Sequence, residues 1–257
     1  MTSPCFEAVI FDFHSTLVDN GNPQSWVLQA LLKRTRTSVD TKEFNEELLL
    51  RRFEEELIEL NKLNNKGKKL KLTPDSSILQ QLFEELNNVW EHAKIIDPDS
   101  KRDLGPEQHR HVFEQIMLRL NIPQDLINPL YEALPEEWQI YEDVIPTLKY
   151  LKEAGKKLGL ISNVGFDIRP ILEREKIIQY FDSIILSYEI GITKPNEEIF
   201  KLSLKELNIK KKQSALMVGD DCKADGGACT FGIPTLLIPK TIGREPHGLS
   251  LVTKIIS

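Results

Sequence analysis

The sequence predicts an α/β protein with a doubly wound, parallel, five-stranded core that is interrupted by an all-helical insertion. Short apolar, β-branched stretches alternate with helix-like stretches in the C-terminal half, which favours parallel strands joined by right-handed crossovers. The interval 23–135 shows helical spacing and no strand pattern. With 257 residues, the chain can form one large domain or two domains of ordinary size.

The first strand is expected at residues 7–13, where the stretch EAVIFDF is apolar, β-branched and aromatic. Four more strands follow the insertion, at 158–162, 183–186, 215–218 and 234–238, and helices are expected at 168–176, 197–207 and 222–231. Buried parallel strands need cover on both faces. These elements therefore predict a Rossmann-like core that comprises residues 1–20 and 138–257.

The insertion, residues 21–137, shows amphipathic helical patterns separated by polar breaks. In FNEELLLRRFEEELIEL, apolar side chains recur at helical spacing: Phe44, Leu48, Phe53, Leu57 and Leu60. The stretches ILQQLFEELNNVW and HVFEQIMLRL have the same character. Because the insertion interrupts the core after the first strand, we expect a helical cap domain over the strand ends. The lysine-rich stretch 66–71 is interpreted as a solvated loop between helices.

Composition and charge exclude several classes of partner. The net charge is −6 and no basic block is present, so we expect no nucleic acid and no anionic membrane as a partner. No apolar segment approaches the roughly 18 residues of a membrane span, and the N-terminus has no targeting pattern. Three cysteines without a metal-ligand spacing predict neither a disulfide framework nor a zinc site. We therefore expect a cytoplasmic protein; the sequence leaves the oligomeric state open.

Polar side chains gather where the expected strands end. In open parallel sheets, ligands bind outside the carboxyl ends of the strands. The residues at these ends are Asp12, Ser162, Asn163, Lys194, Asp220, Asp221 and Asp225. Each alone has a structural explanation as a cap or a turn residue. Together, several carboxylates at a buried edge would repel one another unless a cation held them. Oxygen-only ligands favour Mg²⁺, which typically binds through one or two carboxylates and a substrate phosphate.

Other residues with chemical potential have structural interpretations. His109 and His111 lie two positions apart on an expected helix and therefore on different faces, so a shared metal site is not expected. Trp26, Trp90 and Trp138 are expected in the core rather than as platforms for a substrate.

Four motifs, in order, resemble those of the haloacid dehalogenase-like hydrolase superfamily. They are Asp12 with Thr16 in DFHST, Ser162 in LISN, Lys194 in GITKP, and Asp220 with Asp225 in GDDCKAD. The resemblance covers the whole core, and the helical insertion resembles the cap of the phosphoglycolate phosphatase-like and dehalogenase-like branch. Four motifs in sequence are far more specific than any one of them.

The resemblance implies phosphoryl transfer through an aspartyl phosphate formed on Asp12. It further implies that Thr16, Ser162, Asn163 and Lys194 contact the phosphoryl group of a small phosphorylated substrate. Mg²⁺ would be bound by Asp12, Asp220, Asp225 and the backbone carbonyl of His14. The lysine and the metal would stabilise charge on the transferring group.

His14 departs from the motif, because phosphatases of the superfamily carry a second aspartate there as general acid and base. Histidine, with an unperturbed pKa near 6.5, can give and take a proton near neutrality. Against this, an imidazolium beside Mg²⁺ and Lys194 is repelled by both. We expect His14 in the general acid/base position of a Mg²⁺-dependent phosphatase. A catalytically weak or inactive metal- and phosphate-binding protein, and a metal-independent haloacid dehalogenase, stay open as alternatives.

Overall fold

The computed structural model describes residues 6–35, 45–63, 77–241 and 243–256. Contacts divide the chain into two compact units, which are described separately. The core unit comprises Met1–Asn20, Arg102–Gln108 and Trp138–Ser257, and the helical unit comprises Gly21–Lys101 and His109–Glu137. The lysine-rich stretch 66–71, Phe44 and Cys5 lie outside the described residues.

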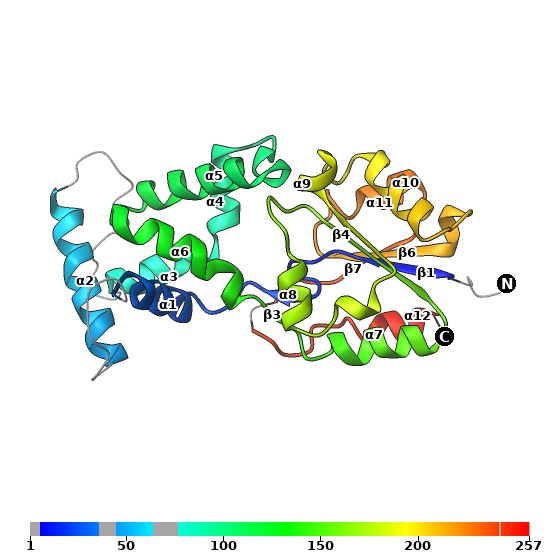
Figure 1. Cartoon of the computed structure of the whole chain (residues 1–257), viewed down its shortest axis with the longest axis horizontal. Coiled ribbons are helices and arrows are strands. Elements are labelled where there is room, and N and C mark those ends of the chain that lie inside the picture. Colours follow the sequence, from blue (N-terminus) through cyan, green and yellow to red (C-terminus); the bar gives the residue numbers. More distant parts are fainter. Residues whose placement is uncertain (1–5, 36–44, 64–76, 242, 257) are drawn as a thin grey trace. The chain divides into compact units, whose positions relative to one another are not determined.

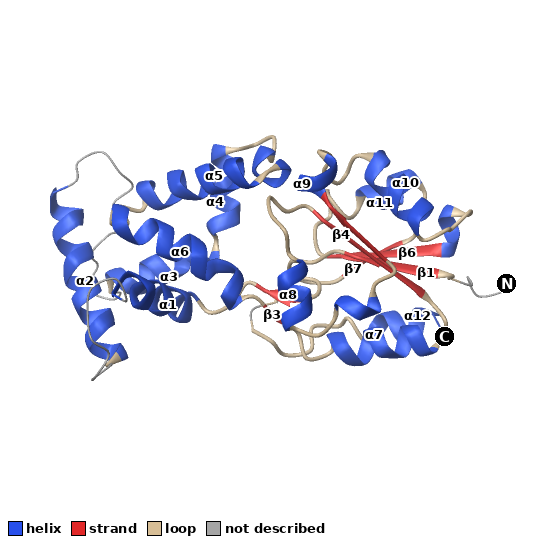
Figure 2. Ribbon diagram, in the orientation of Figure 1, coloured by secondary structure: helices blue, strands red, loops and turns tan. Residues whose placement is uncertain are grey.

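The core unit contains a five-stranded parallel sheet, which confirms the predicted fold class. Its strands are β1 (Ala8–Phe11), β4 (Lys157–Ser162), β5 (Ser183–Leu186), β6 (Ala215–Gly219) and β7 (Thr235–Leu237), in the order β5-β4-β1-β6-β7. Figure 2 shows them in red. Val9 in β1 is paired with Leu158 on one side and with Leu216 on the other. The central strand is therefore the one that leads into Asp12.

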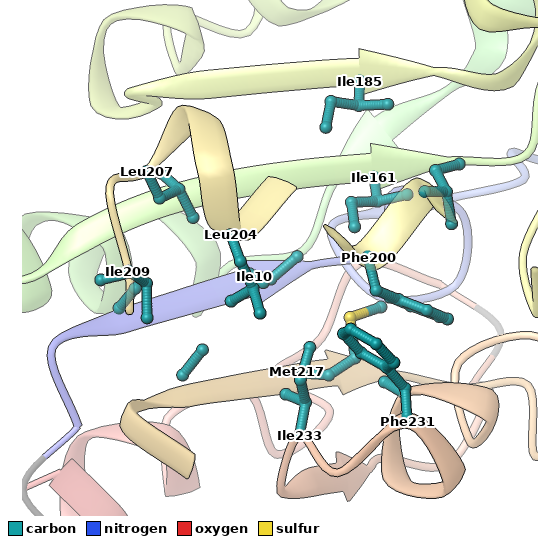
Figure 3. Close-up of a cluster of buried hydrophobic side chains, with 14 residues drawn as sticks. Ile10, Ile161, Ile185, Phe200, Leu204, Leu207, Ile209, Met217, Phe231 and Ile233 are labelled. Carbon is teal, nitrogen blue, oxygen red and sulfur yellow. The ribbon is translucent and has the colours of Figure 1, made fainter. Parts of the chain in front are cut away.

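Helices cover both faces of the sheet. On one face lie α10 (Glu197–Glu206) and α11 (Gly227–Phe231), and on the other lie α7 (Val144–Glu153) and α12 (Leu251–Ile256) (Figure 1). Between the sheet and α10, buried side chains from both layers interlock (Figure 3), among them Ile10, Ile161, Met217, Phe200 and Leu204. Removing this apolar surface from water is the main favourable term for the core unit.

Short helical elements lie in the connections between strands and longer helices. They are α8 (Arg169–Arg174), η2 (Ile178–Tyr180), α9 (Ser187–Ile190) and η3 (Lys212–Ser214). A second, antiparallel sheet pairs β2 (Val18–Asp19) with β3 (Gln139–Ile140). Each of its strands has only two residues, too few for an alternating pattern to be recognised in the sequence.

The helix predicted at 222–231 begins later than expected, at Gly227. Turns replace its first residues because two carboxylates bind nearby backbone N–H groups. Asp225 accepts from the amides of Asp220 and Asp221, and Asp221 accepts from those of Lys223 and Ala224. Aspartate side chains commonly compete in this way with helical hydrogen bonds.

The helical unit is built from α1 (Pro23–Thr35), α2 (Glu46–Leu63), α3 (Ile78–Asn87), α4 (Val89–Ile96), α5 (Pro106–Arg119) and α6 (Gln124–Glu137). Between Pro23 and Pro135 the described residues form no strand, as predicted. α1 packs against α6, and the Trp26 indole donates to the carbonyl of Leu130 at 2.7 Å. Phe53 and Leu57 of α2 are buried, whereas Leu48 is exposed.

The segment Arg102–Gln108 belongs to the core unit although it lies within the insertion. It contains most of η1 (Lys101–Leu104). The Ser187 hydroxyl, wholly buried, donates to the carbonyl of Asp103 at 2.5 Å. Among the described residues, no helix combines the length and apolar character needed to cross a bilayer.

Candidate active site

Asp12 lies directly after β1, at the carboxyl edge of the sheet. Its backbone N–H donates to the carbonyl of Val218 in β6 at 2.9 Å, which continues the strand pairing by one residue. The chain then turns sharply, because the carbonyl of Phe13 accepts from the N–H groups of Leu17 and Val18. The turn holds the Asp12 carboxylate at the carboxyl ends of the strands, where the residue as a whole is 8% exposed.

Lys194 joins two of the predicted carboxylates. Its ammonium nitrogen lies 2.5 Å from Asp12 Oδ1 and 2.7 Å from Asp225 Oδ1, and its side chain is 2% exposed. Burial alone would lower the pKa of Lys194, but the charges of both carboxylates outweigh it and hold the pKa above its ordinary value. The lysine is therefore a fixed positive charge beside Asp12. Removing one partner from such a buried pair is strongly destabilising.

Asp12, Asp220 and Asp225 form a three-carboxylate cluster, in which one oxygen of each lies within 4.8 Å of the others. Burial, followed by the negative charges of Asp12 and Asp225, raises the pKa of Asp220 to about 7. A cation would relieve the repulsion that raises this pKa. An all-oxygen donor set of this kind suits a hard divalent ion such as Mg²⁺.

A glycine makes room for this cluster. A Cβ at Gly219 would lie within 2.6 Å of the Asp225 Cβ and would collide with the Asp225 carboxyl group. Asp225 is wholly buried, and its second oxygen accepts from the amides of Asp220 and Asp221. Asp225 therefore also shapes the loop that carries Asp220. Asp221 instead uses Oδ1 for a local turn, bonded to two backbone amides.

Two hydroxyl groups at the same edge of the sheet are wholly buried. Thr16 lies in the turn after β1, and Ser162 ends β4, the neighbour of β1. Within the described part of the chain, neither Thr16 Oγ1 nor Ser162 Oγ has a hydrogen-bond partner. Buried polar atoms normally have one, so each of these groups is available to a ligand with oxygen acceptors.

The side-chain amide of Asn163 is hydrogen-bonded to the protein backbone. Its Nδ2 donates to the carbonyl of Lys194 at 3.0 Å, and the N–H of Lys194 donates to its Oδ1 at 2.8 Å. The structure therefore brings Asn163 and Lys194 together, but through the Lys194 peptide rather than its ammonium group. The next residue, Val164, donates through its N–H to the hydroxyl of Ser187 at 2.8 Å.

The His14 ring lies in an aromatic environment. It meets Trp138 edge to face at a centroid distance of 4.3 Å and meets Phe13 at 4.9 Å. Among the described residues, its buried Nε2 atom has no hydrogen-bond partner. Burial, together with the charges of Lys194 and Lys240, lowers the pKa of His14 to about 3. At neutral pH the imidazole is therefore uncharged, unlike the freely titrating histidine considered from the sequence.

Trp138 is a contact of the site that the sequence pattern did not assign. It is 1% exposed, as expected for a core residue, and stacks on Phe166 with an interplanar angle of 17°. The guanidinium of Arg174 donates to its backbone carbonyl. The ring of Phe13 also meets that of Trp138, at a centroid distance of 6.1 Å, so the rings of Phe13, His14 and Phe166 all adjoin Trp138.

Trp26 is buried as predicted, whereas Trp90, also expected in the core, is only half-buried. On α5, His109 is buried against Tyr131, whose hydroxyl lies 2.9 Å from His109 Nδ1, while His111 is exposed. The two rings thus lie on different faces of the helix. Cys222 and Cys229 are both free and exposed.

Comparison with known proteins identifies the family. A haloacid dehalogenase-like hydrolase family model matches residues 6–229. A pyrimidine 5'-nucleotidase YjjG from Escherichia coli is 28% identical over 141 residues, which are 54% of this chain and 62% of that protein. A glyceraldehyde 3-phosphate phosphatase from Methanopyrus kandleri is 38% identical over 104 residues, 38% of this chain and 42% of the relative. The chain thus spans about half the length of these two curated relatives.

Solved structures show the same fold. A HAD phosphatase from Thermococcus onnurineus superposes with a TM-score of 0.53 at 20% identity, and the match covers 98% of each chain. At this identity the likeness concerns the fold alone. The family match extends over most of the chain and contains all of the residues gathered around Asp12. The chain therefore belongs to the haloacid dehalogenase-like hydrolase family.

Proposed function

We propose that the chain is a Mg²⁺-dependent phosphatase that hydrolyses a small phosphorylated metabolite through an aspartyl phosphate on Asp12. The arrangement of Asp12 beside Lys194 carries the proposal, because it places a carboxylate nucleophile next to a buried positive charge. The names of two relatives, a pyrimidine 5'-nucleotidase and a glyceraldehyde 3-phosphate phosphatase, support the same class of reaction. Residues 21–137 are proposed as the cap domain that selects the substrate.

The first step transfers the phosphoryl group to the protein. An oxygen of Asp12 forms a bond to phosphorus while the ester P–O bond breaks and the leaving group departs with the electron pair. Lys194 and the hydroxyls of Thr16 and Ser162 bind the phosphoryl oxygens, a role that fits their burial and the available hydroxyl hydrogens. Asn163, which was predicted to contact the phosphoryl group, instead bonds to the peptide of Lys194 through its side-chain amide.

Mg²⁺ fits the site because the cluster supplies three carboxylate oxygens within reach of one ion. Asp12, Asp220, Asp225 and the backbone carbonyl of His14 are the proposed ligands. When bound, the ion would supply positive charge that offsets the charge of the transferring group.

The second step releases inorganic phosphate. Water forms a bond to phosphorus, the bond to Asp12 breaks, and the Asp12 carboxylate is regenerated. His14 holds the general acid/base position in this proposal. We assign its uncharged ring to the attacking water, and the negative charge of a bound phosphoryl group would raise its pKa from about 3 toward the range in which it can accept the proton.

Hydrolysis of p-nitrophenyl phosphate tests the proposal. Activity should require Mg²⁺, stop with EDTA and fall by at least about 10³-fold in Asp12→Asn, because the nucleophile is lost. Asp182→Asn is the matched control, since this carboxylate is paired with Lys152 and binds the N–H at the start of β4. Activity that is indifferent to chelator, or equal in both variants, would contradict the assignment.

One observation favours a second candidate, a metal- and phosphate-binding protein with little turnover. His14 replaces the acidic proton donor, and its lowered pKa leaves no imidazolium to protonate a leaving group at neutral pH. Tight binding of inorganic phosphate with Mg²⁺, combined with no hydrolysis of any phosphate ester, would establish this candidate. Release of halide from a haloacid without metal would instead indicate a dehalogenase.

A further inference from the structure

The amide of Asn163 forms a two-point clamp on the peptide of Lys194. It donates through Nδ2 to the Lys194 carbonyl at 3.0 Å and accepts through Oδ1 from the Lys194 N–H at 2.8 Å. If the amide were flipped, its Nδ2 group would face the Lys194 N–H and its Oδ1 would face the Lys194 carbonyl oxygen. Neither pair could form a hydrogen bond, so the two observed bonds fix the orientation of the amide. The two residues are separated by 31 positions in the chain.

The last residue of β4 and the two residues after it make three different kinds of contact. Ser162 presents a buried hydroxyl without a partner among the described residues. Asn163 binds the peptide of Lys194, and the N–H of Val164 donates to Ser187 at the start of α9. The loop after β4 is thus tied to both ends of the segment that leads from β5 to Lys194.

The Lys194 side chain is long, so the place of its ammonium group depends on where the peptide is held. The ammonium end is bonded to Asp12 and Asp225. On the peptide side, α11 approaches so closely that a Cβ at Gly227 would collide with Pro195 and lie 3.1 Å from its Cα. The Lys194–Pro195 backbone therefore has contacts with both Asn163 and α11.

We infer that Asn163 is a positioning residue that acts through Lys194, rather than an independent ligand of the phosphoryl group. Its acceptor oxygen and one of its donor hydrogens are already used by the Lys194 peptide. Loss of the clamp lets the peptide shift, and the ammonium group then no longer lies where Asp12 and the phosphoryl oxygens need it. This inference rests on the phosphatase function proposed above.

A double-mutant cycle tests the inference. Asn163→Ala should lower kcat/KM for p-nitrophenyl phosphate by about 10- to 100-fold, in line with the cost of small misplacements in active sites. In a Lys194→Gln background the same substitution should change kcat/KM by less than about twofold, because the group it positions is gone. Equal factors in both backgrounds would overturn the inference and make Asn163 an independent ligand.

A second cycle remains measurable if Lys194→Gln has no activity or fails to fold. Gly227→Ala disturbs the Lys194–Pro195 backbone from α11 without changing any charge. The fold-loss in kcat/KM of the double variant should be smaller than the product of the fold-losses of Gly227→Ala and Asn163→Ala, since both act on one peptide. Effects that multiply fully would again contradict a shared route through Lys194.

Asn196→Ala is the matched control. Asn196 lies two residues from Lys194, and its amide oxygen also accepts a backbone N–H, that of Glu198, as the N-cap of α10. Its loss should lower stability by about 1 kcal/mol and leave kcat/KM unchanged. A fall in kcat/KM similar to that of Asn163→Ala would show that general destabilisation explains both variants.

Binding of inorganic phosphate separates this inference from the proposed function. A parent protein that hydrolyses no phosphate ester refutes the phosphatase proposal by itself. Calorimetric titration with inorganic phosphate and Mg²⁺ then measures phosphate affinity in the parent, in Asn163→Ala, in Gly227→Ala and in the double variant, so the cycle needs no turnover. Non-multiplicative losses in phosphate affinity would support the positioning role, and fully multiplicative losses would refute it.

Discussion

The imidazole of His14 and the indole of Trp138 meet edge to face, with 4.3 Å between their centroids and 89° between their planes. Trp138 is the first residue of the core unit after the helical insertion, and Phe166 stacks on it. Aromatic pairs of this geometry add about 0.5–1.5 kcal/mol beyond the area that they bury. The position that departs from the family motif therefore has a specific packing partner.

His14→Ala should lower kcat by about 10²–10⁴-fold, the usual contribution of general acid–base catalysis. If the uncharged imidazole accepts the proton of the attacking water, clearance of the aspartyl phosphate becomes the slow step. Rapid mixing with p-nitrophenyl phosphate should then show a burst of p-nitrophenol equal to the enzyme concentration. His111→Ala, an exposed histidine on α5, serves as the control. A variant as fast as the parent would remove His14 from the mechanism.

Mg²⁺ should stabilise the protein more at about pH 8 than at about pH 6, because protons and metal compete for Asp220. Burial, followed by the charges of Asp12 and Asp225, raises the pKa of Asp220 from 3.8 to about 7. A carboxyl group whose folded pKa is raised makes the metal-free fold less stable as the pH rises through this interval. Thermal unfolding with and without Mg²⁺ measures the effect. Asp220→Asn should reduce the difference and leave the part due to Asp225, whose pKa burial raises to about 6. An equal Mg²⁺ effect at both pH values in the parent would contradict the prediction.

Gly219→Ala should impair activity and stability together. The added Cβ would lie within 2.6 Å of the Asp225 Cβ, so Asp225 must move away from Lys194 and from the amides that it binds. Overpacking of this kind typically costs about 1–3 kcal/mol. Gly105→Ala is the control, because its nearest neighbour would be a Gln108 oxygen at 3.5 Å. Full Mg²⁺-dependent activity in Gly219→Ala would show that the position of Asp225 is not critical.

His247→Ala should destabilise the core unit by about 1–3 kcal/mol, the cost of leaving a buried polar partner unsatisfied. His247 stacks on Tyr141 at 3.7 Å, and its Nδ1 lies 3.3 Å from Asp143 Oδ1. Urea unfolding gives the difference in free energy, and Lys254→Ala on the exposed side of α12 is the control.

The same pair predicts a pH dependence. Burial acts to raise the pKa of Asp143, but the hydrogen bond and charge of His247 and the Ser250 amide outweigh it, so the pKa lies below 3.8. Its stabilising contribution is therefore present above about pH 3.8 and is lost as the pH falls through the lower folded value. The decline should be smaller in His247→Ala. An identical acid profile in parent and variant would exclude this pair as its source.

The five strands could be predicted because each is a short, continuous apolar run between polar turns. The range 183–186 coincides with β5, and the other ranges agree with the structure to within two residues at either end. α7 lacked a prediction although Val144, Leu148 and Leu151 repeat at helical spacing. The ribbon of β2 and β3 depends on pairing between residues far apart in the chain, which no local pattern records.

The parallel sheet explains why four charged side chains come together, because each of them follows the carboxyl end of a strand. They are Asp12, Lys194, Asp220 and Asp225. Two features of the site could be identified only from the three-dimensional structure. The partner of Asn163 is a backbone peptide 31 residues away. The lowered pKa of His14 reflects burial and charges in three dimensions, whereas composition supplies only the ordinary value of 6.5.

The central place of β1 in the sheet has a consequence for slow opening motions. Within the described part of the chain, β5 and β7 are the outermost strands and each pairs with one neighbour, whereas β1 is flanked by β4 and β6. Edge strands therefore fray at a lower free-energy cost, and amide hydrogens of β1 should exchange with solvent only through global unfolding. The strand that leads into Asp12 is thus the last to lose its register when the fold loosens.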